Sequence, residues 1–246
     1  MFAQEYYFQL WKRVKKMGTD DIKKKKMAEK TKNNAYQSRK IGVIPPNPTI
    51  LIMCEGEKTE PNYFDEFKLS NVSVKLESTK GGDALHVVQQ AIKLADEEPY
   101  DEVWCVFDRD LHTENPQPER FNEAIYKVEN FKTLKEYKIS KNFKRVKKFN
   151  YAYSNDAFEL WYILHFDYMH SAKPRHEYCK MLSMRMGKKY VKNSCDMYDD
   201  LIDKQSHAIR RAKTLLDEYA NHNPEKDNPS TTVHILVQEL NKYLES

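Results

Sequence analysis

Residues 49–60 read TILIMCEGEKTE, and this stretch decides the fold. Its first six residues, Thr49–Cys54, form a continuous apolar run of strand length, which is typical of a strand covered on both faces. The run ends at Glu55-Gly56, and a helix start follows, with Thr59 expected as its N-cap and Pro61 in the first turn. A buried strand that leads directly into a helix is the beginning of an α/β unit.

The same alternation continues beyond this stretch. Apolar runs of strand length recur and are separated by segments with helical spacing of apolar residues. The expected strands are 74–79, 102–107 and 149–153, and the expected helices begin near Asp83 and span about 118–137. The pattern predicts an α/β fold with a mostly parallel, Rossmann-like sheet flanked by helices. The remaining third reads as helical, and Ser230 is expected to cap its last helix.

The charge of the chain is unevenly distributed. The formal net charge of +4 conceals a charge of +8 on residues 1–40, so that residues 41–246 sum to −4. We therefore expect a basic N-terminal arm over residues 1–48, an α/β core over 49–155 and a helical part over 156–246 that packs on the core.

Several classes of protein are excluded. No apolar run approaches the roughly 18 residues that span a bilayer, and the N-terminus lacks the pattern of a secretory signal, so no membrane partner is expected. The four cysteines show no CxxC spacing, and Cys54 and Cys105 lie in strand-like runs where reduced, buried thiols are expected. The cytoplasm is the expected location, and a zinc site is not expected.

Acidic residues follow two of the expected strands. Glu55 ends the first strand, and Asp108 and Asp110 follow the third, two residues apart and therefore on the same side. Neighbouring carboxylates about 4 Å apart repel by about 4 kcal/mol per pair at an effective dielectric of 20, so a cluster of three needs a cation. Oxygen ligands favour Mg²⁺ or Mn²⁺, and Glu60 is placed to help hold a second ion. The alternative is that these acids are helix caps and loop residues; the metal site is favoured because two strand ends carry them.

These segments resemble a known family. The stretch CEGEKTE at 54–60, together with FDRD at 107–110, is similar to the TOPRIM domain. Further segments make the chain resemble, more closely, the RloB-like TOPRIM family of bacterial defence loci: SNDAFELW at 154–161, LHF at 164–166 and NPSTTV at 228–233. The resemblance covers about residues 44–244. Asp156 departs from it, because the family usually has proline there.

The resemblance implies a function and a set of site residues. Glu55, Asp108 and Asp110 match the metal-binding acids of TOPRIM domains, and Glu60 matches a second acid of related nucleases. The implied activity is metal-dependent hydrolysis of phosphodiester bonds in DNA or RNA during anti-phage defence, with Mg²⁺ or Mn²⁺ as cofactor. The alternative is an effector or binding subunit that is inactive alone and is triggered by an ATPase encoded nearby, since the sequence has no Walker A motif. The target nucleic acid and the oligomeric state stay open.

Three further residues are candidates for catalysis. Glu159 lies in an otherwise apolar segment, and a surface glutamate and a site residue are about equally expected there. Lys58 is a candidate for transition-state charge stabilisation, although an exposed loop lysine is its default interpretation. His112 is a candidate for contacting phosphate or moving a proton, and its support is the DxDxH pattern of the family.

Two basic stretches suit a polyanion, and the alternative for each is a solvated surface. One is the arm, with Lys23, Lys24, Lys25 and Lys26. The other is the stretch 132–148, where aromatic residues are interleaved with lysines that would flank the acidic site. Its candidate nucleic-acid contacts are Lys141, Lys144, Arg145, Lys147 and Lys148.

Overall fold

The chain builds a five-stranded sheet with the strand order β2-β1-β3-β4-β5. The computed structural model describes residues 47–110, 117–137 and 140–244. The first four strands are parallel, and the last is antiparallel to its neighbour. Their bounds are β1 Thr49–Cys54, β2 Ser73–Ser78, β3 Glu102–Asp108, β4 Lys148–Asn155 and β5 Ser230–Thr231. The predicted α/β class and the mostly parallel sheet are confirmed.

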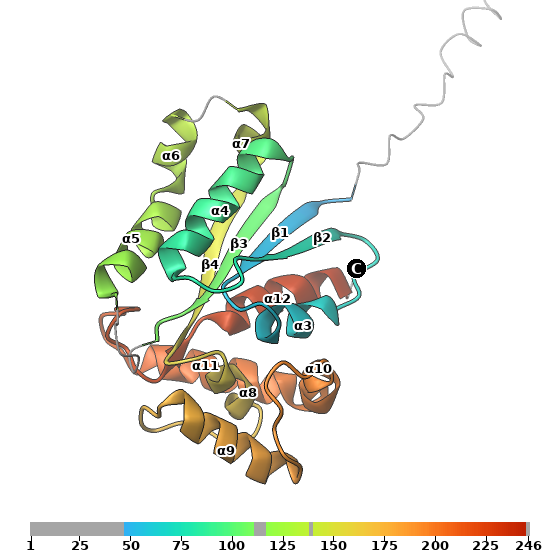
Figure 1. Cartoon of the computed structure of the whole chain (residues 1–246), viewed down its shortest axis with the longest axis vertical. Coiled ribbons are helices and arrows are strands. Elements are labelled where there is room, and N and C mark those ends of the chain that lie inside the picture. The colour runs from blue at the N-terminus through green and yellow to red at the C-terminus, as the bar shows by residue number, and fades with distance from the viewer. Residues whose placement is uncertain (1–46, 111–116, 138–139, 245–246) are drawn as a thin grey trace, which may run out of the picture. The chain divides into compact units, whose positions relative to one another are not determined.

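Helices cover both faces of the sheet, so that three layers form (Figure 1). Alternate residues of β1 supply the two cores, with Ile50 and Ile52 on one face and Leu51 and Met53 on the other. The face that carries Leu51 and Met53 is covered by α4 Ala84–Glu97, α5 Pro118–Glu129, α6 Phe131–Tyr137 and α7 Lys141–Arg145. The face that carries Ile50 and Ile52 is covered by α3 Thr59–Asp65, α8 Glu159–Leu164, α9 Arg175–Met186, α10 Met197–Leu201, α11 Gln205–Asp217 and α12 Val233–Leu244, with a 3₁₀ turn at Ile202–Lys204.

Several predicted helix boundaries need correction. Thr59 is the first residue of α3 and Lys58 is the N-cap; the Thr59 hydroxyl instead donates a hydrogen bond to Asn193 Oδ1 at 2.7 Å. The expected helix over 118–137 breaks at Asn130, which is the C-cap of α5. The predicted cap at Asp83 is confirmed, because its side chain accepts a hydrogen bond from the N–H of His86 at 3.0 Å.

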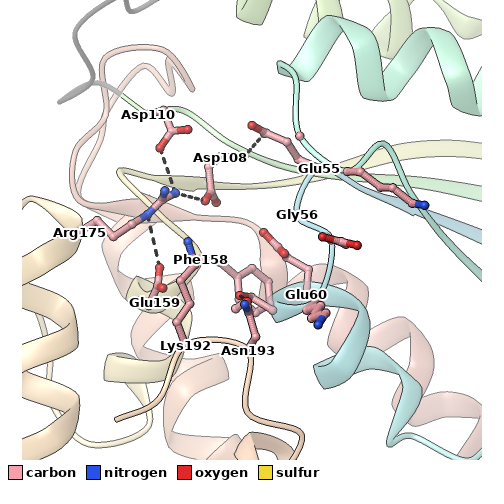
Figure 2. Close-up of a pocket in the computed structure, with 15 residues that line it drawn as sticks. Glu55, Gly56, Glu60, Asp108, Asp110, Phe158, Glu159, Arg175, Lys192 and Asn193 are labelled. Atoms are coloured by element: carbon pink, nitrogen blue, oxygen red, sulfur yellow. Dashed lines mark hydrogen bonds and ion pairs between the residues drawn. The ribbon is translucent and has the colours of Figure 1, made fainter.

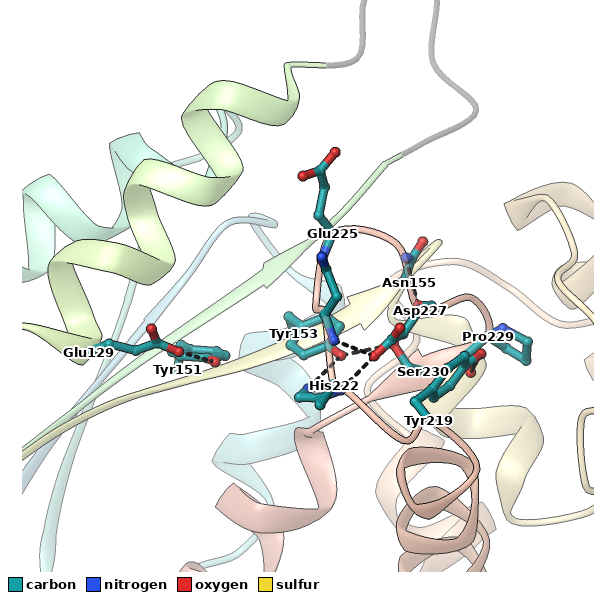
Figure 3. Close-up of polar contacts among 11 residues, drawn as sticks. Glu129, Tyr151, Tyr153, Asn155, Tyr219, His222, Glu225, Asp227, Pro229 and Ser230 are labelled. Atoms are coloured by element: carbon teal, nitrogen blue, oxygen red, sulfur yellow. Dashed lines mark hydrogen bonds and ion pairs between the residues drawn. The ribbon is translucent and has the colours of Figure 1, made fainter.

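The C-terminal third contributes a strand as well as helices. Ser230 was predicted to cap the last helix, but it lies in β5, which pairs with the end of β4. Its buried hydroxyl donates to the C=O of Asp227 at 2.7 Å and lies 2.9 Å from the Tyr153 hydroxyl. His222 joins this network, with Nδ1 2.7 Å from Asp227 Oδ2 and Nε2 3.3 Å from the Tyr153 hydroxyl (Figure 3). The network fastens β5 to β4 at the edge of the sheet.

Residues from Asn47 onward form one compact unit. The expected basic arm, including Lys23–Lys26, lies almost entirely outside the described residues. Within the described part of the chain, no helix has the length and apolar character needed to cross a membrane. Cys54 and Cys105 are free and buried, as expected.

Candidate functional site

A cavity of about 330 Å³ opens at the carboxyl ends of β1 and β3. The two strands are parallel neighbours, and the N–H of Glu55 donates to the C=O of Val106 at 2.9 Å, so the residues that follow both strands emerge side by side. Six acidic residues line the cavity: Glu55, Glu57, Glu60, Asp108, Asp110 and Glu159. The structure therefore brings together the acids that follow the two strands, at the edge where ligands of parallel sheets bind.

Backbone hydrogen bonds hold Glu55 in place. Its Oε2 accepts a hydrogen bond from the N–H of Asp108 at 3.1 Å, which ties the two strand ends together across the cavity. Its C=O accepts a hydrogen bond from the N–H of Gly81 at 2.9 Å. The residue after β1 is thus fixed by contacts from β3 and from the turn that follows β2.

Arg175 lies among the carboxylates. Its Nη2 donates to Asp108 Oδ2 at 2.6 Å and to Asp110 Oδ1 at 2.9 Å, and its Nε lies 3.6 Å from Glu159 Oε2 (Figure 2). Arg175 is the first residue of α9, so this helix delivers one guanidinium to acids that come from β3 and α8.

Glu60 projects into the cavity from the first turn of α3. It is 5% exposed, and its Oε2 is buried without a hydrogen-bond partner among the described residues. The carboxylate packs against Gly56, where an added Cβ would lie 2.1 Å from Glu60 Oε2. The small residue after Glu55 therefore creates the space that Glu60 occupies.

Glu159 lines the cavity, which excludes the interpretation of a surface glutamate, and its role in the site stays a prediction. It is 1% exposed at the start of α8, so it is not a surface glutamate. Its Oε1 accepts a hydrogen bond from the Tyr190 hydroxyl at 3.3 Å, and its Oε2 faces Arg175. Glu159 thus faces the guanidinium with one carboxylate oxygen and the Tyr190 hydroxyl with the other.

The carboxyl groups of the cavity have raised pKa values. Burial raises the pKa of Glu55 to about 8; the hydrogen bond from the Asp108 N–H opposes this shift, and repulsion from Asp110 and Glu60 adds to it. Burial also raises the pKa of Asp108 well above its ordinary value, although Arg175 opposes this shift. Burial raises the pKa of Glu60, and repulsion from Glu159 adds to the shift. One guanidinium therefore does not compensate the negative charge that the cavity gathers.

The donor chemistry of the cavity suits a divalent metal ion. The site offers carboxylate oxygens, which are the ligands that Mg²⁺ and Mn²⁺ prefer, and Glu60 supplies a buried oxygen without a partner. As the side chains stand, no three His, Cys, Asp or Glu residues within the described ranges lie close enough together to hold a metal ion. The side chains are therefore of the type that binds Mg²⁺ or Mn²⁺. Their present positions, however, are determined by hydrogen bonds from Arg175 to Asp108 and Asp110.

The model of the family described as RloB-like protein matches residues 50–240, which include the whole cavity. The chain belongs to the RloB-like family. This confirms the resemblance seen in the sequence. No curated protein and no solved structure matches the chain.

The other predicted site residues of this RloB-like chain fall in different places. Lys58 is exposed at the rim of the cavity, and His112 lies outside the described residues. Asn155, four residues before Glu159, lies outside α8, because it ends β4 and its Nδ2 donates to the C=O of Asp227 at 2.9 Å. Asp156 is buried beside the site, where its C=O accepts a hydrogen bond from the N–H of Asp110 at 3.1 Å.

The second basic stretch does not flank the acids. It precedes and begins β4, whose eight residues extend about 23 Å, and the residues of the stretch that the structure describes do not line the cavity. Arg145 and Lys147 pair with Asp101 at 3.0 and 3.1 Å, and Lys148 pairs with Glu102 at 2.9 Å and Glu239 at 2.6 Å. The expected position next to the metal site is therefore wrong, because the stretch lies at the amino ends of the strands. Lys141 and Lys144 are exposed on α7, and nucleic-acid binding by this stretch stays a prediction.

Sequence reasoning missed the residues that close the cavity from the C-terminal part. Arg175 follows Pro174 at the start of a helix, and nothing in its spacing links it to the strand ends. Lys192 and Asn193 lie in the segment after α9, and Tyr190 precedes them. No local pattern identifies these residues, because only the packing of α8 and α9 against one another brings them to the acids.

Proposed function

We propose that this chain is a divalent-metal-dependent nuclease that hydrolyses phosphodiester bonds of DNA or RNA in bacterial anti-phage defence. The observation that carries the proposal is the convergence of six acidic residues on one cavity at the carboxyl ends of β1 and β3. The support for the defence role is the resemblance to the family of defence loci.

The side chains of the cavity divide into ligands and phosphate contacts. Glu55, Asp108 and Asp110 would hold the first cation, and Glu60 would contribute to a second. When bound, such a cation supplies Lewis acidity and lowers the pKa of an attacking water.

Cationic side chains at the rim of the cavity would bind the substrate. Lys58, Lys80 and Lys192 line the cavity beside the acids. An acidic centre repels a phosphodiester, and these ammonium groups offset that repulsion, so that the backbone of the nucleic acid is held over the carboxylates.

The test is cleavage of plasmid DNA, single-stranded DNA and transfer RNA in parallel, each with Mg²⁺, with Mn²⁺ and with EDTA. We expect cleavage of one substrate class that requires the cation and falls by about 100-fold or more in Glu55→Ala and Asp108→Ala, since both lose a metal-binding carboxylate. Asp65→Asn is the matched control, because Asp65 is an exposed acid at the end of α3 and lies outside the cavity. Full activity in both alanine variants would refute the proposal.

A further inference from the structure

Arg175 occupies the same oxygen atoms that a metal ion would need. One nitrogen, Nη2, donates to both Asp108 Oδ2 and Asp110 Oδ1, at 2.6 and 2.9 Å. It is the only arginine among the residues that line the described cavity. We propose that Arg175 is an internal counterion that a divalent cation must displace, so that metal binding frees this guanidinium to contact the substrate phosphate. The inference rests on the proposed function and concerns the regulation of the same site.

The cation and the guanidinium exclude one another. A metal ion binds carboxylate oxygens at about 2.1 Å, so an ion on Asp108 Oδ2 and Asp110 Oδ1 would lie against the nitrogen that bonds to both oxygens. Arginine cannot lose its charge in a protein, so proton release cannot relieve the repulsion. The side chain of Arg175 must therefore move before the ion can bind.

Arg175 is placed so that it can move. It is the first residue of α9, it follows Pro174, and its side chain is 35% exposed, whereas the Asp108 side chain is 8% exposed. Its third contact, to Glu159, is long at 3.6 Å. Glu159 itself stays fixed when the arginine leaves, because Tyr190 donates a hydrogen bond to its other oxygen. The acids therefore keep their supports while the guanidinium swings toward the open side of the cavity.

The released side chain has a second use. A guanidinium presents paired N–H donors that match two phosphate oxygens, and it is less strongly hydrated than an ammonium group. The displaced Arg175 would thus join Lys58 and Lys192 at the mouth of the cavity. One side chain would neutralise the acids in the resting protein and the phosphate in the metal-loaded protein.

The experiment measures Mn²⁺ binding to the full chain by isothermal titration calorimetry after treatment with EDTA, at constant ionic strength. The variants are Arg175→Gln, Arg175→Lys and Lys192→Gln. Lys192→Gln is the matched control, because it removes one positive charge from the same cavity without vacating the Asp108 and Asp110 oxygens. Asp108→Asn locates the binding event, since it removes a carboxylate that the ion needs.

We expect Arg175→Gln to bind Mn²⁺ about tenfold more tightly or better than the wild type, because the ion no longer competes with a bound guanidinium. Lys192→Gln should change the affinity by about threefold or less, as expected for a charge that acts at longer range. Without metal, Arg175→Gln should unfold at a lower temperature than the wild type, and saturating Mn²⁺ should raise its unfolding temperature by more than it raises that of the wild type.

The outcomes separate the two proposals. The counterion role is overturned if the wild type and Arg175→Gln bind Mn²⁺ with equal affinity. It is also overturned if Arg175→Gln and Lys192→Gln gain the same Mn²⁺ affinity; both results leave the proposed metal site intact. Binding that survives in Asp108→Asn overturns the inference as well, since the ion then lies elsewhere. Absence of Mn²⁺ binding in the wild type and in Arg175→Gln overturns the proposed function together with the inference.

Discussion

A methyl group at position 56 tests whether this glycine creates the space for Glu60. In Gly56→Ala the new Cβ would lie 2.1 Å from Glu60 Oε2, 2.9 Å from its Cδ and 3.0 Å from its Oε1. No other neighbouring atom would lie closer than 3.0 Å to this Cβ. The φ of Gly56 lies outside the left-handed region, so alanine is acceptable to the backbone. The clash is therefore confined to one carboxylate.

The magnitude follows from two opposing effects. Overpacking a buried site costs about 1–3 kcal/mol, because the Glu60 carboxylate is 5% exposed and has little room to withdraw. Replacement of glycine by alanine also reduces the entropy of the unfolded chain, which stabilises the protein by about 0.4–1 kcal/mol. Gly56→Ala should thus lower the free energy of unfolding by about 1–2 kcal/mol. In the Glu60→Ala background the clash is absent, and Gly56→Ala should raise the free energy of unfolding by about 0.4–1 kcal/mol.

The assay is urea unfolding of four proteins, followed by tryptophan fluorescence in EDTA: wild type, Gly56→Ala, Glu60→Ala and the double variant. The expected result is a reversal of sign, with a coupling energy of about 2 kcal/mol between the two positions. If Gly56→Ala destabilises both backgrounds by the same amount, the cost arises from the backbone and the packing argument is wrong.

Two further predictions concern stability and pH. Burial alone would raise the pKa of Asp101, but Arg145, Lys147 and the N–H of Thr49 lower it to about 2. The ionised Asp101 therefore stabilises the folded protein fully above pH 4, and this contribution is lost as the pH falls through 2. Asp101→Asn should therefore cost about 2 kcal/mol at pH 7 and little at pH 2, as measured by urea unfolding. Burial lowers the pKa of His234 to about 4, so the protein should lose about 2–3 kcal/mol of stability as the pH falls from 6.5 to 4. His234→Phe should flatten this part of the pH profile; an unchanged slope would contradict the assignment.

The strands and the acids that follow them could be predicted from the sequence because both are local signals. The run at 49–54 has the length and composition of a buried strand, and the register of β1 with β3 then places Glu55 beside Asp108. A parallel sheet leaves one edge at which residues after the strands meet, so the acidic site followed from the topology.

The remaining parts of the site depend on contacts between distant segments. Arg175 carries no pattern that connects it to residues 67 and 65 positions earlier in the chain. β5 is two residues long, which is too short for an alternation of apolar and polar residues to show, and its Ser-Thr sequence is also typical of a helix cap. The basic stretch before β4 has the composition of a nucleic-acid contact, but Arg145, Lys147 and Lys148 pair with acidic residues of the same protein, which composition alone does not show.

The position of α12 has a consequence for the order in which the protein acquires its shape. The residues Val233, Leu236, Val237 and Leu240 bury the face of the sheet that carries Ile50 and Ile52, and β5 completes the sheet edge just before this helix. The ribosome makes these segments after β1, β2, β3 and β4, so β1 cannot be fully covered on that face until they have been made. A truncated product that stops before β5 would therefore leave the apolar residues on this face of the sheet exposed to solvent.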